Sequence, residues 1–192
     1  MPMGEDTMRI KAEFLLVGVV VWMMSACASK PPSSPPQVDH VRYKPKAIEV
    51  YLKADPQLNL YEGSPNSLRV CIYQLQDPNS FNQHAQEPEG LRKLLEGERF
   101  DGSVTNAKKV VIQPGREETM TLDRAEGTRY VGVVAGYYLL DSLEKDKVVR
   151  LFEIPVIIEK KGMIRKKKTI KPGVLCINLF MAPDGLQEFE RE

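Results

Sequence analysis

The chain has 192 residues, of which 42% are hydrophobic and 28% charged, and its 27 basic residues nearly balance 26 acidic ones. This length suits one domain with attachments and excludes a multidomain enzyme, and the composition argues against global disorder or a polytopic membrane protein. A formal net charge of +1 gives no support for whole-molecule attraction to nucleic acid. Three cysteines and two histidines without C-x-x-C or H-x-x-x-H spacing argue against a metal site.

The N-terminal segment predicts export from the cytoplasm. Arg9 and Lys11 precede an uninterrupted apolar run of 11 residues at 14–24. A membrane-spanning helix needs about 20 such residues. A basic start, a short apolar run and small residues behind it are typical of a signal peptide.

The processing site predicts lipid attachment. Residues 24–27, Met-Ser-Ala-Cys, resemble a bacterial lipobox, in which the chain is cut before an acylated cysteine. We therefore expect residues 1–26 to be removed and Cys27 to carry the lipid, with an ordinary secretory signal beside a coincidental cysteine as the alternative. Ala28 in place of an aspartate implies, by resemblance to sorting rules of enteric-type bacteria, a lipid anchor on the periplasmic face of the outer membrane.

A tether is expected to follow the anchor. Residues 28–44 hold four prolines and three serines. Proline-rich chain extends by about 3.1 Å per residue, so this segment spans up to roughly 50 Å. We expect residues 27–44 to form the lipidated cysteine and tether, and residues 45–192 to form the folded domain.

The mature chain predicts mainly strands, because apolar residues alternate with polar ones in many short runs. The run at 130–138 is the most apolar of them and predicts a central strand. Only residues 88–96 have helical spacing of leucines, with Gly97 as a stop. Short strands separated by turn residues favour a two-sheet β-sandwich with one short helix insertion. The predicted strands cover residues 48–52, 68–75, 109–112, 118–122, 130–138, 148–159, 163–170 and 174–181.

Several segments together resemble a known family. They are the lipobox and tether, the first strand, Leu-Arg-Val-Cys-Ile-Tyr-Gln-Leu at 68–75, a leucine helix after Phe81, Gln-Pro-Gly at 113–115 and Val-Gly-Val-Val-Ala at 131–135. Over the whole mature chain they resemble the TssJ-type outer-membrane lipoproteins of type VI secretion systems.

The resemblance implies a scaffold rather than a catalyst. The expected fold is a transthyretin-like β-sandwich without a cofactor. The expected partner is the periplasmic C-terminal domain of a TssM-type inner-membrane protein, which the lipoprotein holds at the outer membrane beside other proteins of the secretion membrane complex.

The connection after the first strand is the candidate binding segment. Residues 55–66 are far longer than a hairpin turn and carry apolar side chains among polar ones. Apolar side chains on a loop suit recognition, and in TssJ-type proteins the loop at this position engages the partner. The alternative is that the apolar side chains fold back over the end of the sandwich. Tyr61 is the first residue to test, because a ring with a polar tip is typical of interface anchors. The candidate residues are Leu58, Asn59, Leu60, Tyr61 and Glu62.

A basic cluster predicts a hairpin near the C-terminus. Lys160, Lys161 and residues 165–168 flank Gly162 between two strand-like runs. No aromatic residue is interleaved, which argues against a nucleic-acid patch. The lysines either protect a solvated sheet edge or contact an acidic partner or anionic headgroups.

Cys71 and Cys176 both lie in predicted strands. In the oxidising periplasm they either form a disulfide, which needs Cα atoms within about 7 Å, or remain two small buried side chains.

No catalytic constellation is present, so we expect no enzyme. His40 lies beside the tether and His84 in a polar loop, and no nucleotide-binding, G-x-S-x-G or H-E-x-x-H motif occurs. Glu117 and Glu118 are adjacent, so on a strand they point to opposite faces. Two other hypotheses remain open, namely a lipoprotein that binds a small ligand or glycan in the same sandwich, and an envelope hydrolase that uses carboxylates.

Overall fold

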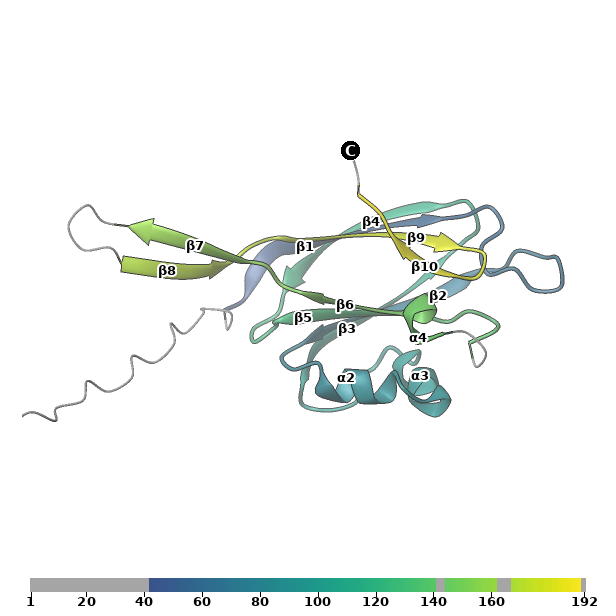
Figure 1. Cartoon of the computed structure of the whole chain (residues 1–192), viewed down its shortest axis with the longest axis horizontal. Helices are drawn as coiled ribbons and strands as arrows, with labels where there is room; N and C mark the ends of the chain where they lie inside the picture. The colour runs from purple at the N-terminus through teal and green to yellow at the C-terminus, as the bar shows by residue number, and fades with distance from the viewer. Residues whose placement is uncertain (1–41, 141–143, 162–166, 191–192) are drawn as a thin grey trace, which may run out of the picture. The chain divides into compact units, whose positions relative to one another are not determined.

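The computed structural model describes residues 42–140, 144–161 and 167–190 (Figure 1). The expected signal peptide, Cys27, His40 and nearly all of the expected tether lie outside the described residues. The division into signal peptide, tether and domain therefore stays a prediction. Across the described ranges, no helix has the length and apolar character needed to cross a membrane.

Two four-stranded sheets form a sandwich. The first has the strand order β10-β9-β1-β4 and contains β1 (Lys44–Ala54), β4 (Glu117–Arg124), β9 (Leu175–Ala182) and β10 (Gly185–Glu188). Its strand β1 pairs parallel with β9 and antiparallel with β4. The second has the order β3-β2-β5-β6 and is antiparallel throughout. It contains β2 (Leu68–Leu75), β3 (Val104–Ile112), β5 (Tyr130–Ala135) and β6 (Val149–Glu153).

The first sheet has one buried face and one open face. Ile48, Val50 and Leu52 of β1 are fully buried, whereas Glu49 and Lys53, at the alternate positions, are exposed. The same period-two pattern runs along β9. Successive side chains of a strand point to opposite faces, so this alternation places the core between the sheets and leaves the outer face to solvent.

The two inner strands of the second sheet, β2 and β5, are covered on both faces. Helices α2 (Asn79–His84) and α3 (Pro88–Leu94) lie beside this sheet (Figure 1). Tyr73 of β2 points toward them, and its hydroxyl donates a 2.5 Å hydrogen bond to the carbonyl of Leu94. A Cβ at Gly132 would lie 2.6 Å from the ring of Phe81. Only a glycine therefore lets α2 approach β5 this closely.

The two-sheet sandwich and the interior position of β5 are confirmed, but four details of the prediction were wrong. The insertion contains two short helices instead of one, and the one-turn helix α4 (Lys145–Val148) was not expected. The run at 148–159 is divided into β6 and β7 (Val156–Lys161) at Pro155, which has no N–H for a strand ladder. Strand β5 ends at Ala135, so residues 137–138 are outside it.

The strand pairing of the expected basic hairpin is confirmed, whereas Gly162, Arg165 and Lys166 lie outside the described residues. β7 pairs antiparallel with β8 (Lys167–Pro172) as a separate two-stranded ribbon, with Lys160 opposite Lys168 and Lys161 opposite Lys167. The ribbon leaves the sandwich at the end where β1 begins (Figure 1).

The two cysteines of the mature domain are free thiols. Cys71 is buried on the helix-covered face of β2, where its Sγ lies 3.6 Å from the carbonyl oxygen of Leu95. Cys176 is exposed and lies between buried residues of β9, on the outer face of the other sheet. The structure contains no bridge because the two side chains point away from the shared core. The expectation that both are buried was right for Cys71 and wrong for Cys176.

Candidate functional site

The base of the β1–β2 connection is built into the end of the sandwich. The amide of Asp55 donates to the carbonyl of Met181 at 3.0 Å, and the carbonyl of Asp55 accepts from Gly115 at 3.1 Å. Leu58 is fully buried in the core, and its carbonyl accepts from the amide of Asn66 at 2.9 Å. The base thereby links β1 to β9 and to the β3–β4 turn, and Leu58 folds back as the second sequence interpretation proposed.

Asn59 joins this loop to the segment that follows β5. Its side chain is 3% exposed. The side-chain oxygen accepts from the amide of Tyr138 at 2.8 Å, and the side-chain nitrogen donates to the carbonyl of Ser67 at 3.0 Å. The backbone φ of 49° is positive, a conformation that asparagine tolerates better than most residues. Asn59 is thus a structural residue and is not available to a partner.

The tip of the loop is a tight hairpin turn. Tyr61 and Ser64 exchange backbone hydrogen bonds of 3.0 and 2.9 Å. The two residues between them, Glu62 and Gly63, both have positive φ, at 48° and 76°. Two-residue turns of this kind match the twist of the flanking strands, so the tip holds a defined shape.

Four exposed apolar side chains gather around this tip. Leu60 and Tyr61 are 37% and 40% exposed, and Tyr138 and Leu139 are 58% and 52% exposed. The rings of Tyr61 and Tyr138 stack with centroids 4.6 Å apart and an interplanar angle of 11°. We call Leu60, Tyr61, Tyr138 and Leu139 the tip patch.

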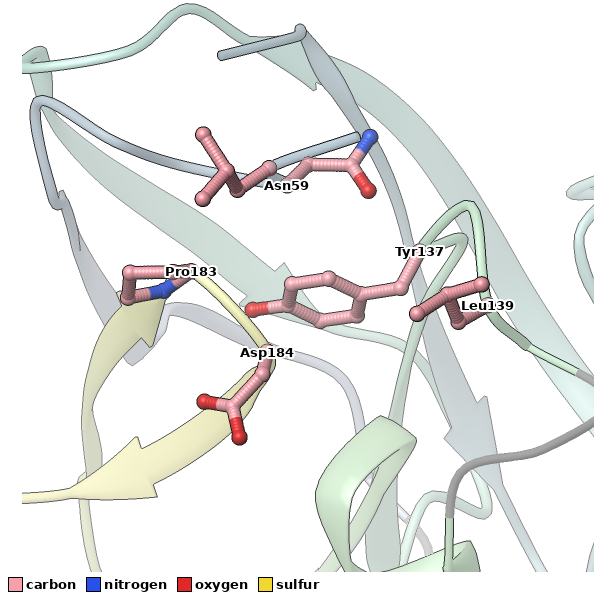
Figure 2. A pocket seen from close by; sticks show the side chains of 6 residues that line it. Asn59, Tyr137, Leu139, Pro183 and Asp184 are labelled. Atoms are coloured by element: carbon pink, nitrogen blue, oxygen red, sulfur yellow. The ribbon is translucent and has the colours of Figure 1, made fainter. Parts of the chain in front are cut away.

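A small cavity lies beneath the tip patch (Figure 2). Its volume is about 40 Å³, enough for water but not for an organic ligand. Tyr137 extends into it toward the β9–β10 turn, and its hydroxyl donates to the carbonyl of Ala182 at 3.2 Å (Figure 2). Burial raises the pKa of Tyr137, so the phenol stays neutral. The cavity lining comprises Asn59, Leu60, Tyr137, Leu139, Pro183 and Asp184.

A larger hollow borders Tyr138. It is an open groove of about 300 Å³, at the low end of the volumes of ligand pockets. Arg69 supplies its one charged side chain, and Val111 adds an apolar side chain that is 57% exposed. The groove thus extends the apolar surface and does not enclose a ligand.

Of the five candidate residues, the structure places three at the surface and two inside. Leu60, Tyr61 and Glu62 are exposed, whereas Leu58 and Asn59 are buried. The sequence prediction missed Tyr138 and Leu139, because it ended the central strand at residue 138. The apolar run Tyr-Tyr-Leu-Leu that continues behind Gly136 is the feature that could have revealed them.

The described residues bring no catalytic groups together. No three His, Cys, Asp or Glu side chains in the described ranges gather as a metal site. His84 ends α2 instead of lying in a loop, and its ring packs edge-on against Phe100 at 5.0 Å. Glu117 binds Lys53 at 3.3 Å and accepts from the hydroxyl of Tyr51 at 2.6 Å, both at the exposed surface.

Comparisons with known proteins agree with this fold. A family model described as "Type VI secretion lipoprotein, VasD, EvfM, TssJ" matches residues 46–168. A search of curated proteins gave no match.

Three solved structures are similar in fold. The type VI secretion lipoprotein TssJ1 from Pseudomonas aeruginosa superposes with a TM-score of 0.53 at 19% identity, over 77% of this chain and 98% of that chain. The membrane-bound type VI component Lip of Serratia marcescens gives 0.50 at 15% identity, over 76% and 98%. A chain from the structure described as the T6SS protein TssM C-terminal domain from EAEC gives 0.51 at 19% identity, over 75% and 98%.

Proposed function

Because the chain belongs to the type VI secretion lipoprotein family, we propose that it anchors the periplasmic C-terminal domain of a TssM-type inner-membrane protein at the outer membrane. The family is structural and is not a family of enzymes. In this proposal the acyl chains on Cys27 insert into the outer membrane, the tip patch binds the partner, and the sandwich connects the two. The exposed, stacked pair Tyr61 and Tyr138 is the observation that carries it.

The anchor follows from the lipobox. A single myristoyl chain binds a bilayer only reversibly, and stable attachment takes further chains or a second attraction. Bacterial lipoproteins carry three chains on the processed cysteine, which makes Cys27 a firm anchor. Intact-mass measurement of the purified chain tests this directly, because processing and acylation at Cys27 change the mass in a defined way.

The tip patch has the properties of a protein-binding surface. A few residues carry most of the binding energy at interfaces, and tyrosine is among the types enriched there. Here the hairpin turn at 62–63 and the hydrogen bonds of Asn59 already hold the patch in shape. Binding therefore orders few groups, which reduces the entropic cost of association.

The small-ligand alternative has less support. The enclosed cavity of about 40 Å³ is too small, and the groove of about 300 Å³ is open and has few converging polar groups. A hydrolase would require carboxylates or a histidine facing one bond, and the described residues place His84 and Glu117 in separate surface contacts.

Calorimetric titration with the periplasmic C-terminal domain of the TssM-type protein from the same organism tests the proposal. A soluble chain from residue 28 onward, without the acylated cysteine, is compared with its variants Leu60→Ser and Tyr138→Ala. Each substitution removes an interface anchor and is expected to weaken binding by about 30-fold, the effect of losing a residue that contributes roughly 2 kcal/mol.

Matched control variants exist elsewhere on the sandwich. Leu151 is 38% exposed against 37% for Leu60, and Tyr43 is 57% exposed against 58% for Tyr138. Leu151→Ser and Tyr43→Ala should therefore bind as the parent does. Equal losses in the patch and control variants would contradict the tip patch as the interface, and absence of binding by the parent would contradict the proposed function.

A further inference from the structure

The β7–β8 ribbon concentrates positive charge. β7 contains Lys160 and Lys161, β8 contains Lys167, Lys168 and Lys171, and Glu159 is the one acidic residue in either strand. The backbone register places Lys160 opposite Lys168 and Lys161 opposite Lys167. Like charges directly opposite one another destabilise a strand pair. The register assigns one of these opposed lysine pairs to each face of the ribbon, because successive residues of a strand alternate between faces. A negative surface would offset the repulsion within a pair.

The ribbon arises next to the start of β1. Lys44, the first residue of β1, donates from its Nζ to the carbonyl of Pro172, the last residue of β8, at 3.4 Å. The amide of Gly173 donates to the carbonyl of Pro155 at 2.7 Å and closes the base of the ribbon. The chain that leads from Cys27 therefore enters the domain at the base of the basic ribbon.

Exposed apolar side chains surround this base. Val156 and Ile157 are 45% and 53% exposed, Val174 is 43% exposed, and Tyr43 is 57% exposed. The hydroxyl of Tyr43 donates to the carboxylate of Asp123. Lysines beside exposed aliphatic and tyrosine side chains are typical of surfaces that lie at the bilayer interface.

We propose that the β7–β8 ribbon is a second membrane contact, which docks on a surface of anionic phospholipids. This proposal rests on the proposed anchor at Cys27, because the anchor brings the ribbon within tether length of the bilayer. The extended tether reaches roughly 50 Å, so the lipid alone does not set the orientation of the domain. Each lysine near an anionic surface contributes about fivefold in binding, and the ribbon adds this attraction to the acyl chains.

Docking of the ribbon would orient the tip patch. The 11 residues of β1 run from the base of the ribbon to the β1–β2 connection, and at about 3.3 Å per residue they separate the two by roughly 35 Å. The β1–β2 connection, which contains Leu60 and Tyr61 of the tip patch, lies at the end opposite the ribbon (Figure 1). With the ribbon on the bilayer, the tip patch therefore faces the periplasm, where the partner is expected.

Hydrogen–deuterium exchange on the full lipoprotein in vesicles tests the proposal. The chain is reconstituted through its own acyl chains into vesicles of phosphatidylcholine alone and of phosphatidylcholine with phosphatidylglycerol. We expect the amides of β7 and β8 to exchange about tenfold more slowly in the anionic vesicles. Salt at about 0.5 M should remove the difference by screening. Amides of β1 and β2 serve as the measure of an intact fold.

A charge-matched pair of variants controls for net charge. The ribbon variant is expected to lose the slow exchange, and the control variant is expected to keep it. The ribbon variant carries Lys160→Gln, Lys161→Gln, Lys167→Gln and Lys168→Gln. The control removes four exposed positive charges elsewhere, with Lys93→Gln, Lys108→Gln, Arg116→Gln and Arg129→Gln.

Two results would overturn the proposal. Equal exchange of β7 and β8 in both kinds of vesicle would exclude a contact with anionic lipid. Protection that appears only after the partner's periplasmic domain is added would assign the ribbon to an acidic protein surface. Retention of the chain on phosphatidylcholine vesicles reports the Cys27 anchor separately, so failure of the anchor is distinguished from failure of the ribbon.

Discussion

The base and the tip of the β1–β2 connection differ in burial and in their contacts although they are neighbours in sequence. Leu58 is fully buried, whereas Leu60 is 37% exposed. Asn59 between them bonds across to Tyr138, and Tyr61 stacks on the ring of that same residue. One loop thus separates residues that hold the fold from residues that are available for recognition. Substitutions along it should affect stability and binding independently.

Replacement of Leu58 by alanine should have the largest effect on stability. Removing a fully buried leucine leaves a cavity, so we expect Leu58→Ala to lower the free energy of unfolding by about 3 kcal/mol. Leu60→Ala in the same loop is the matched control and should lose less than about 1 kcal/mol. Urea unfolding followed by circular dichroism measures both free energies. Equal losses in the two variants would show that the base and the tip of the loop do not differ in their contribution to stability.

The substitution Asn59→Ala should have the next largest effect on stability. The change leaves the amide of Tyr138 and the carbonyl of Ser67 without their partner and puts alanine at a positive φ. We expect a loss of about 2 kcal/mol. The control is Asn66→Ala, whose side chain bonds carbonyls in the more exposed part of the loop and should lose about half as much. A larger loss of stability in Asn66→Ala than in Asn59→Ala would show that Asn59 is not the main link between the β1–β2 loop and the segment after β5.

Tyr61→Ala should have a modest effect on stability. Its ring is 40% exposed and packs on Tyr138. Stacked aromatic pairs contribute about 1 kcal/mol beyond their buried area, so a double-mutant cycle with Tyr138→Ala should give a coupling energy of that size. A coupling energy near zero would show that the two tyrosines act separately, and the tip patch would then lose its preorganisation.

The smallest expected effect is a gain in stability from Glu62→Asn. Glu62 has a φ of 48° and precedes Gly63, and Asn-Gly is the preferred pair in a two-residue hairpin turn of this kind. We expect a gain of about 0.5 kcal/mol, measured as a higher urea midpoint. Glu118→Asn on β4 is the control and should bring no gain, because asparagine is unfavourable in strands. A loss at position 62 would indicate that the carboxylate stabilises the tip.

Period-two patterns predicted most of the strands because alternation is a local property. Ile48, Val50 and Leu52 form the core face of β1 as expected. The first helix of the insertion was missed because Asn-Ser-Phe-Asn-Gln-His buries one apolar residue, Phe81, and has no apolar period. Its place depends on the glycine at 132, which lies about fifty residues further along the chain.

The sequence identified the candidate segment but not which of its side chains are exposed. Residues 55–66 were identified from their length and apolar content, yet the pattern could not separate Leu58 from Leu60. Their difference depends on the carbonyl of Pro183, which accepts from the amide of Leu60 at 3.2 Å, and on Tyr138, which bonds Asn59. Both lie far away in sequence.

The sequence by itself predicted the class of the protein, because the resemblance to a lipobox, the proline-rich segment and the short alternating strands are all patterns of neighbouring residues. The tertiary structure decided which side chains of the β1–β2 loop are buried, that Cys71 and Cys176 point away from each other, and that the tip patch and the basic ribbon occupy opposite ends of β1. The physical reason is the parallel pairing of β1 with β9. That contact brings together strands more than a hundred residues apart, and no local pattern specifies it.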